Sequence, residues 1–312
     1  MRAGPLKAAV PAAPLLDAAE LGRLQQLALQ YRSRSGRARQ SPGPGRHHGA
    51  LRGQGMELHD VRPYRPGDDV RHMDWRATAR SGRPITKVFV EENARRLFLF
   101  IDRRPGMMFG TRRELKAATA VRVAALLAFT ALADREPVAG LVLGAEVHHH
   151  APVHTPEGAL PLLLQAAAAP APVVAGADPA QQPLHEALRA AAARQSAAGA
   201  LIYLISDFAD VADGRAGLAD YLPPVNRAQA IALRIVDAAE QELPAAGPVR
   251  LAAPAGGPSV LIDTSDAVLR QRYRERMAAR EQALRAACAR HRIPLYTVSN
   301  RFELLPQLEA LL

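Results

Sequence analysis

From Leu97 to the end of the chain, short apolar runs alternate with longer stretches that have the period of a helix. The apolar runs have strand length and contain few polar residues, which is typical of strands buried on both faces. Such strands alternating with helices predict a mostly parallel sheet, doubly wound, with helices covering both faces. The predicted strands are 97–101, 138–143, 201–206, 230–236 and 294–298, with an edge strand at 145–153, and the predicted helices are 114–134, 156–168, 184–196, 269–288 and 304–312.

The part of the chain before this domain has a different organisation. Residues 15–31 are predicted to form an amphipathic helix, because Leu21, Leu24 and Ala28 recur at the spacing of one helix face. Residues 32–55 are rich in Arg, Gly, Ser and Pro without periodicity, which predicts an irregular connection. The expected divisions are an N-terminal helix with its basic connection (1–55), a small strand-containing region (56–95) and the α/β domain (96–312).

The net charge of +10 is concentrated in the front of the chain. Residues 1–90 hold 16 Lys and Arg against 7 Asp and Glu, whereas the remainder holds 24 against 23. A basic region of this kind favours nucleic acid, anionic lipid or an acidic protein as partner. Only three of the 40 basic residues are lysines, and the chain is rich in both Ala and Arg. Because this bias can reflect genome composition, the arginine excess by itself is weak evidence for a ligand.

Cysteine usage and hydropathy bear on the compartment. The one cysteine, Cys288, excludes an internal disulfide and falls on the apolar stripe of a predicted helix, which indicates a packed thiol. Residues 1–16 lack the unbroken apolar core of a secretory signal. The longest apolar run, 123–133, is shorter than the roughly 20 residues that span a bilayer. We expect a cytoplasmic protein without a membrane span.

Three predicted strands end in or are followed by an aspartate, namely Asp102, Asp207 and Asp237. In an open parallel sheet the carboxyl ends of the strands meet at one edge, where ligands bind. Carboxylates gathered there favour a hard cation such as Mg²⁺, whereas a single strand-end aspartate often only caps the segment that follows. Arg104 stands where a dehalogenase-type site needs a second acid, and phosphate-binding Gly-x-x-x-x-Gly-Lys-Ser/Thr and nucleophilic Gly-x-Ser-x-Gly patterns are both missing. We therefore expect no enzymatic activity.

A group of histidines lies on and after the predicted edge strand: His148, His149, His150 and His154. Successive residues of a strand point to opposite faces, so the three in a row cannot all converge on one metal ion. We interpret them as residues of an exposed edge strand rather than as a transition-metal site.

Residues 60–80 contain the chain's only tryptophan, Trp75, among four aspartates and five arginines. So many charges around a large aromatic side chain are unsuited to an apolar core. The side chains either satisfy one another in a polar cluster or form a recognition surface. The expected local structure is a turn at Pro66-Gly67, a helix over 70–80 that Asp68 and Asp69 cap and Gly82 ends, and a strand over 85–90.

This stretch resembles the signature of the bacterial family called domain of unknown function 58. The matching positions are Arg62, Tyr64, Gly67, Asp68, Asp69, Arg71, Asp74 and Trp75, followed by Ala79 and Arg80. The resemblance extends over residues 50–312 and implies a von Willebrand factor A-like α/β domain, preceded by a small strand-rich region. It also implies a partnership with MoxR-type AAA+ ATPases, which are held to act as chaperones that mature or activate other proteins.

The resemblance further implies where a metal would bind, and there this chain departs from the pattern. Von Willebrand A domains that bind metal use Asp-x-Ser-x-Ser after the first strand, a Thr from a second loop and an Asp from a third. The first loop here reads Asp102-Arg103-Arg104-Pro105-Gly106 and lacks both hydroxyls, and the second-loop position reads Ala177-Asp178-Pro179. Only Asp207 fits the third loop. Because Arg104 puts a fixed positive charge at a ligand position, we expect it to repel Mg²⁺ and to pair with Asp102 or Asp207.

The favoured function is that of a non-enzymatic adaptor that engages a MoxR-type AAA+ ATPase or its client, without a cofactor. Within the signature we expect a network of charge-assisted hydrogen bonds with Trp75 packed beneath it, which either orients this region or contacts the partner directly. The expected network joins Arg62, Arg71 and Arg80 to Asp68, Asp69 and Asp74. The alternatives are nucleic-acid binding through residues 32–83 and metal-dependent ligand binding of the von Willebrand A type.

Overall fold

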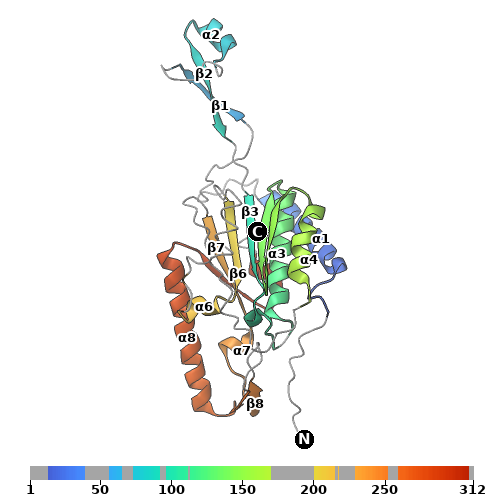
Figure 1. Cartoon of the computed structure of the whole chain (residues 1–312). Coiled ribbons are helices and arrows are strands. Elements are labelled where there is room, and N and C mark those ends of the chain that lie inside the picture. The colour runs from blue at the N-terminus through green and yellow to red at the C-terminus, as the bar shows by residue number, and fades with distance from the viewer. Residues whose placement is uncertain are drawn as a thin grey trace. The chain divides into compact units, whose positions relative to one another are not determined.

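The computed structural model describes residues 13–38, 56–64, 73–91, 96–111, 113–169, 200–214, 217, 229–251 and 259–308. The chain divides into two compact units, a sheet unit (Met1–Pro42 with Arg96–Leu312) and a signature unit (Gly43–Arg95). Figure 1 shows the helices and strands of both. The helix predicted at 184–196 and the second-loop position at 177–179 lie outside the described residues.

The sheet unit contains a six-stranded sheet in the order β10-β7-β6-β3-β4-β5. Its strands are β3 (Arg96–Asp102), β4 (Val138–Leu143), β5 (Val147–Val153), β6 (Ala200–Ser206), β7 (Gln229–Val236) and β10 (Leu295–Ser299). Every neighbouring pair is parallel except β4 and β5, which are antiparallel. This is the doubly wound strand order, and its direction reverses between β3 and β6. The predicted α/β class and the von Willebrand A-like arrangement are thus confirmed.

Helices cover both faces of the sheet, as a doubly wound fold requires (Figure 1). One face carries α3 (Lys116–Ala133) and α4 (Pro156–Ala167), with α1 (Ala18–Ala38) packed on α3. The other face carries α8 (Ala267–Arg290), whose Cys288 is buried in the core as the sequence predicted. The sheet is therefore buried on both sides, which explains why its strands read as nearly continuous apolar runs.

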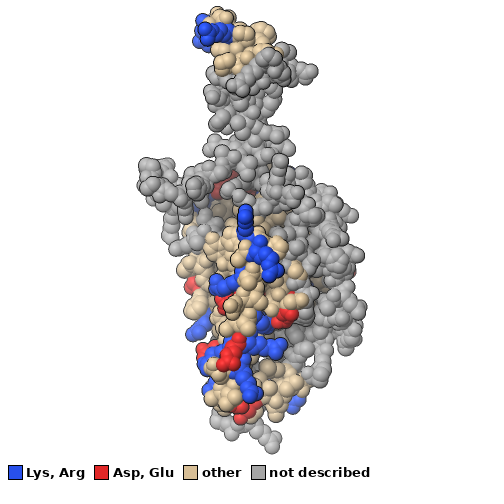
Figure 2. All heavy atoms as spheres, turned by 90° about the vertical axis from the view of Figure 1, so that its left-hand side faces the viewer, with Lys and Arg blue, Asp and Glu red and all other residues tan. Residues whose placement is uncertain are grey.

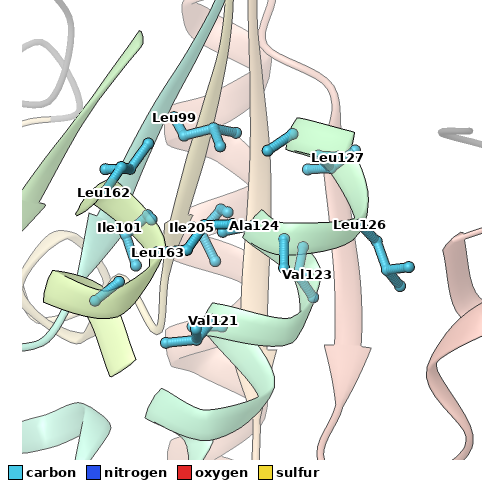
Figure 3. Close-up of a cluster of buried hydrophobic side chains, with 14 of the residues drawn as sticks. Leu99, Ile101, Val121, Val123, Ala124, Leu126, Leu127, Leu162, Leu163 and Ile205 are labelled. Atoms are coloured by element: carbon cyan, nitrogen blue, oxygen red, sulfur yellow. The ribbon is translucent and has the colours of Figure 1, made fainter. Parts of the chain in front are cut away.

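Alternate residues of the central strand β3 belong to the two different cores. Leu99 and Ile101 pack with α3 and α4, whereas Phe98 and Phe100 belong to the core on the α8 side. Figure 3 shows the first core, where Leu99 and Ile101 lie among side chains such as Val121 of α3. Because the β3 side chains are fixed from both faces, the carboxyl end of this strand is held in place for the site described below.

The N-terminal helix α1 confirms the predicted amphipathic face. Leu21, Leu24 and Ala28 are buried against the sheet unit. An ion pair of 2.6 Å joins Glu20 to Arg122 of α3. The helix continues to Ala38, so the prediction that an irregular connection starts at residue 32 is wrong for residues 32–38.

Helix α3 has enough length and apolar character to cross a membrane by those criteria alone. In this protein, however, 83% of it is buried inside the fold. It contacts β3, α1 and α4, so it serves as the central helix of the larger core.

The remaining described elements of the sheet unit are short, and the sequence did not predict several of them. A hairpin of β8 and β9 precedes α8, and its two strands pair antiparallel outside the main sheet. Four-residue strands are too short to give a periodic signal. The short elements are η2 (Pro105–Met107), α6 (Ala209–Ala212), α7 (Ala238–Gln241), β8 (Pro248–Leu251), β9 (Val260–Asp263) and α9 (Leu304–Leu308).

The described residues of the signature unit form an antiparallel hairpin and a short helix. Strand β1 (Met56–Pro63) pairs with β2 (Ile85–Glu91), and α2 (Trp75–Ser81) lies between them in the chain. The helix starts later than predicted, because Asp74 and not the Asp68-Asp69 pair provides its N-cap. Gly82 ends it in the left-handed region with φ 67°, as predicted.

Candidate functional sites

The strand order places the predicted aspartates at one edge of the sheet. Strands β3, β6 and β7 are neighbours and parallel, so Asp102, Asp207 and Asp237 all lie at their carboxyl ends. The reversal of strand order falls between Asp102 and Asp207, which is where ligands bind in open α/β sheets. In this chain two cationic side chains, Arg104 and Lys116, pair with carboxylates at this edge, and we call the group the strand-end cluster.

Arg104 holds the first half of the cluster. Its Nη2 lies 2.7 Å from Asp102 Oδ2, and its Nη1 lies 2.5 Å from Asp210 Oδ2. Asp102 is fully buried and also accepts hydrogen bonds from Ser206 Oγ at 2.6 Å and from the Arg104 backbone N–H at 2.9 Å. The predicted pairing of Arg104 with Asp102 is therefore confirmed, while its second partner is Asp210 in α6 and not Asp207.

Lys116 holds the second half. It is the first residue of α3 and is 1% exposed, so its ammonium group depends on protein partners in place of water. Its Nζ donates to Asp207 Oδ2 at 2.8 Å and to Glu240 Oε1 at 2.5 Å. Asp207 also accepts from the Ala209 backbone N–H at 3.1 Å. Two cations thus pair with four carboxylates at the switch point of the sheet.

Burial and the attraction between Lys116 and Asp207 shift the pKa of each group in opposite directions. Burial by itself lowers the pKa of Lys116, but the carboxylates of Asp207 and Glu240 outweigh it, so the pKa is raised above the ordinary lysine value. Burial likewise raises the pKa of Asp207, but the Lys116 ammonium and the hydrogen bonds outweigh it, and the pKa is lowered. Both groups are therefore charged at neutral pH.

The backbone next to the strand-end cluster adopts a strained conformation at Phe208 and approaches the Asp207 carboxylate closely at Gly106. Phe208 is buried and has φ 52°, a left-handed conformation that is unfavourable for a bulky residue, and its N–H donates to Ser206 Oγ at 3.0 Å. A Cβ on Gly106 would lie 3.1 Å from Asp207 Oδ2. Gly106 stands at the second hydroxyl position of the metal-binding pattern, so a serine there would press on the Asp207 carboxylate.

Asp237, the third strand-end aspartate, caps the helix that follows it, whereas Arg104 and Lys116 pair with other carboxylates. Its side chain caps α7 by accepting from the Ala239 N–H at 2.9 Å. It also accepts from Thr111 Oγ1 at 2.5 Å and from Asn300 Nδ2 at 2.8 Å. Burial raises the pKa of Asp237, but the hydrogen bonds from Thr111 and Asn300 outweigh it and the pKa is lowered. For this residue the capping interpretation is correct.

The strand-end cluster does not fit a divalent metal ion. Mg²⁺ needs oxygen ligands that face a common point, whereas Asp102 and Asp207 face the cationic groups of Arg104 and Lys116. Across the described part of the chain, the acidic, histidine and cysteine side chains form no group of three or more able to hold a metal ion. His148, His149 and His150 lie on β5, which forms the edge of the sheet as predicted.

In the signature unit, hydrogen bonds fix α2 on the hairpin. The Asp74 N–H donates to Ile85 O at 2.8 Å, and the Ile85 N–H donates to Thr78 Oγ1 at 3.0 Å. Asp74 Oδ1 accepts from the N–H groups of Arg76 and Ala77, both at 3.0 Å. The main observed role of the Asp74 side chain is therefore to cap helix α2.

Trp75 is 67% exposed, so the prediction that it packs beneath a charge network is wrong. Arg76, Arg80 and Arg83 are also exposed, and Arg80 Nε donates to Arg76 O at 3.3 Å. The helix has no buried residue, and its outer side displays the tryptophan among arginines. Tyr64 is half-buried, and its N–H donates to Pro84 O at 2.9 Å. Outside the described residues or side chains lie Arg62, Gly67, Asp68, Asp69 and Arg71.

Sequence reasoning missed three members of the strand-end cluster: Lys116, Asp210 and Glu240. Their partners lie far away in the chain, since Lys116 and Glu240 are 124 residues apart and Arg104 and Asp210 are 106 apart. One signal was available for Lys116, which is one of three lysines in a chain that otherwise uses arginine as its cation. Asp210 and Glu240 carried no such signal.

The doubly wound sheet and its strand-end cluster define a von Willebrand A-like domain in which side-chain cations face the strand-end carboxylates. The chain belongs to the family described as protein of unknown function DUF58, whose sequence profile matches residues 60–283. The match includes most of the signature unit and most of the sheet, so the family extends over both units.

Curated relatives are uncharacterized mycobacterial proteins. Mb1516 of Mycobacterium bovis and Rv1480 of Mycobacterium tuberculosis are each 28% identical over 249 residues, which is 78% of this chain and 72% of theirs. Among solved structures, BatB from Bacteroides thetaiotaomicron matches with a TM-score of 0.35 and 12% identity, over 69% of this chain and 94% of that one. An aerotolerance-related membrane protein from Bacteroides fragilis matches with a TM-score of 0.29 and 12% identity, over 62% and 97%.

Proposed function

We propose that this protein is a non-enzymatic interaction protein whose signature helix α2 docks onto a partner through Trp75. The observation that carries the proposal is the 67% exposure of the chain's only tryptophan in the middle of the family signature. A tryptophan left in water forgoes a large burial free energy, and Trp and Arg are the residues most enriched at binding hot spots. Exposed Arg76 and Arg80 supply charged groups around this anchor.

The rigidity of the helix supports the same proposal. Both ends of α2 are capped, by Asp74 and by Gly82, and Thr78 joins the helix to β2. Such a preorganised element loses little conformational entropy on binding. The seven-residue helix would be marginal alone, so its caps hold the Trp75 side chain on a defined element.

The proposed partner is a MoxR-type AAA+ ATPase or a client of that ATPase. This part of the proposal rests on the signature resemblance and on membership of the DUF58 family. The strand-end cluster supports a mode of binding that needs no divalent metal, since Arg104 and Lys116 already face its carboxylates. The interaction would therefore be carried by protein side chains alone.

The test is affinity capture of the tagged full chain from its native cell, with ATP and with ADP, followed by identification of the captured proteins. Capture of a MoxR-type ATPase by the wild type is expected, and Trp75→Ala should reduce it by about tenfold or more. Phe302→Ala is the matched control, because Phe302 is a 60% exposed aromatic in the sheet unit. That variant should capture as the wild type does.

Two outcomes would overturn the proposal. One is wild-type capture without any AAA+ ATPase in either nucleotide state. The other is equal capture by Trp75→Ala and the wild type. A salt-sensitive retention of the wild type on single-stranded DNA or RNA, abolished in Trp75→Ala, would instead support the nucleic-acid alternative, because exposed Trp and Arg also stack on bases.

A further inference from the structure

The β8–β9 hairpin exposes an apolar face that the fold does not cover. Its register pairs Val249 with Ile262 and Leu251 with Val260, and strand alternation places these four side chains on one face. Leu251 is 44% exposed and Val260 is 58% exposed. On the opposite face Leu261 is 62% exposed. Aliphatic side chains gathered at this density on a surface usually mark an interaction site.

The hairpin is held firmly to the start of α8. Thr264 follows β9 and is 1% exposed. Its N–H and its Oγ1 both donate a hydrogen bond to Gly247 O, each at 2.8 Å. The Ala246 N–H donates to Thr264 Oγ1 at 2.9 Å, and Arg270 Nη1 donates to Thr264 O at 2.7 Å. Figure 1 shows β8 beside the N-terminal end of α8. The hairpin is therefore joined directly to the first turns of the helix, and both elements display exposed apolar side chains.

The first turns of α8 add a further exposed valine and two cations. Val268 is 59% exposed, and Arg272 and Arg276 follow it at the four-residue spacing of one helix face. Both arginines are exposed, and in the described part of the chain neither has an ion pair or a hydrogen bond through its side chain. Other arginines of α8 are paired, as Arg280 is with Asp213 at 2.7 Å and Arg285 with Glu281 at 2.6 Å.

Helix α8 itself carries a net positive charge. It contains seven Arg and two Glu, and Figure 2 shows basic side chains with acidic ones among them on this face of the sheet unit. A second copy of the same surface would bring like charges together, which disfavours self-association through it. An acidic partner is attracted by the same field.

We propose that the surface formed by the β8–β9 hairpin and the first turns of α8 binds an acidic amphipathic segment of a partner protein. Aliphatic side chains of the segment would cover Leu251, Val260 and Val268, and its carboxylates would pair with Arg272 and Arg276. Nucleic acid is a poorer fit, because the exposed apolar side chains Leu251, Val260 and Val268 are aliphatic and offer no aromatic ring for base stacking. The inference extends the proposed interaction role to a second surface, in keeping with a protein that joins two others.

The test uses fluorescently labelled 20-residue peptides and the full chain, with binding followed by fluorescence anisotropy. The probe is a helical Leu/Glu peptide with its leucines on one face. The comparison probes are the same peptide with Lys in place of Glu, a Glu peptide without Leu, and a single-stranded oligonucleotide. The Leu/Glu peptide is expected to bind at least tenfold more tightly than each of the others.

Variants locate the site. Arg276→Glu and Val260→Ser should each weaken Leu/Glu binding at least fivefold, whereas the charge-matched Arg290→Glu at the far end of α8 should leave it unchanged. Thermal unfolding of each variant checks that the fold is retained. Trp75→Ala should bind the peptide as the wild type does, so failure of the α2 proposal and failure of this one are distinguishable.

Several results would overturn the inference. These are no binding of the Leu/Glu peptide, equal binding of the Leu/Lys peptide, tighter binding of the oligonucleotide, or equal effects of Arg276→Glu and Arg290→Glu. Loss of peptide binding in Trp75→Ala would also contradict it, because the peptide would then bind to the signature unit.

Discussion

The strand-end cluster and the signature helix α2 use the same residue types in opposite ways. At the strand ends, Asp102 and Lys116 are buried and meet partners of opposite charge within hydrogen-bonding distance. On α2, Trp75 and Arg80 are exposed, and the acidic residue Asp74 caps the helix. A high density of Arg and Asp in a sequence therefore does not tell whether the charges will be paired inside or displayed outside.

The physical reason is the amount of structure around each group. The strand-end cluster is enclosed by elements from four distant parts of the chain, so burial is deep and an unpaired charge would be costly. In the described part of the signature unit, a two-stranded hairpin accompanies a seven-residue helix that has no buried residue. So few elements surround α2 that they cannot desolvate its charged groups, and Arg76 and Arg80 stay exposed.

The largest expected effect is that of Lys116→Ala. Removing this cation leaves the Asp207 carboxylate buried without its main partner, and we expect unfolding of the sheet unit to become easier by about 3–5 kcal/mol. Urea unfolding followed by circular dichroism measures the change. Arg76→Ala, which removes an exposed cation from α2, should change the free energy of unfolding by less than about 0.5 kcal/mol. Equal effects of the two substitutions would remove the contrast between the regions.

A smaller but still clear effect is expected for Arg104→Ala. Asp102 keeps its hydrogen bonds from Ser206 Oγ and from a backbone N–H, and Arg104 is partly exposed, so we expect a loss of about 2–3 kcal/mol. The matched substitution in the signature unit is Arg80→Ala, with an expected loss below about 0.5 kcal/mol. Denaturant midpoints of the two variants compare them directly. An Arg80 effect as large as that of Arg104 would mean that the signature charges are paired after all.

The smallest expected effect is a decrease in the stability of the folded protein as the pH is lowered. The folded pKa of Asp207 is lowered, so its contribution to stability is present above the unfolded value of about 3.9 and is lost as pH falls through the folded pKa. The pKa of Lys116 is raised, so its contribution is present below about 10.4 and is lost as pH rises through the folded pKa. Urea midpoints between pH 7 and pH 3 should fall, and the fall should be shallower in Asp207→Asn. An unchanged slope in that variant would refute the assignment.

The overall fold could be predicted from the sequence because strands that are buried on both faces are nearly continuous apolar runs. Val138–Leu143 was predicted with its observed bounds, and the strand that contains His148 was predicted as an edge strand beside it. The β8–β9 hairpin was missed because four-residue strands are too short for periodicity to show. The start of α2 was misplaced because Asp68 and Asp69 were expected to cap it, whereas Asp74, a few residues later, is the N-cap.

About half of the residues in the strand-end cluster could be predicted from the sequence. Asp102, Asp207 and the pairing of Arg104 followed from strand ends and from an altered loop motif. The remaining members, Lys116 and Glu240 among them, became partners only through the packing of α3 and α7 at the edge of the sheet. No local pattern marks a lysine at the start of an apolar helix as a buried cation.

The sequence by itself determined the class of fold, the family signature and the expectation that Arg104 pairs with a strand-end aspartate, Asp102 or Asp207. The structure selects Asp102, two positions away in the chain. Only the tertiary structure decided which charges are buried and which are displayed. Burial is set by the elements that surround a side chain, and these come from distant parts of the chain. That is why Lys116 lies inside a matched cluster while Trp75, the most conspicuous residue in the sequence, stands on an exposed helix.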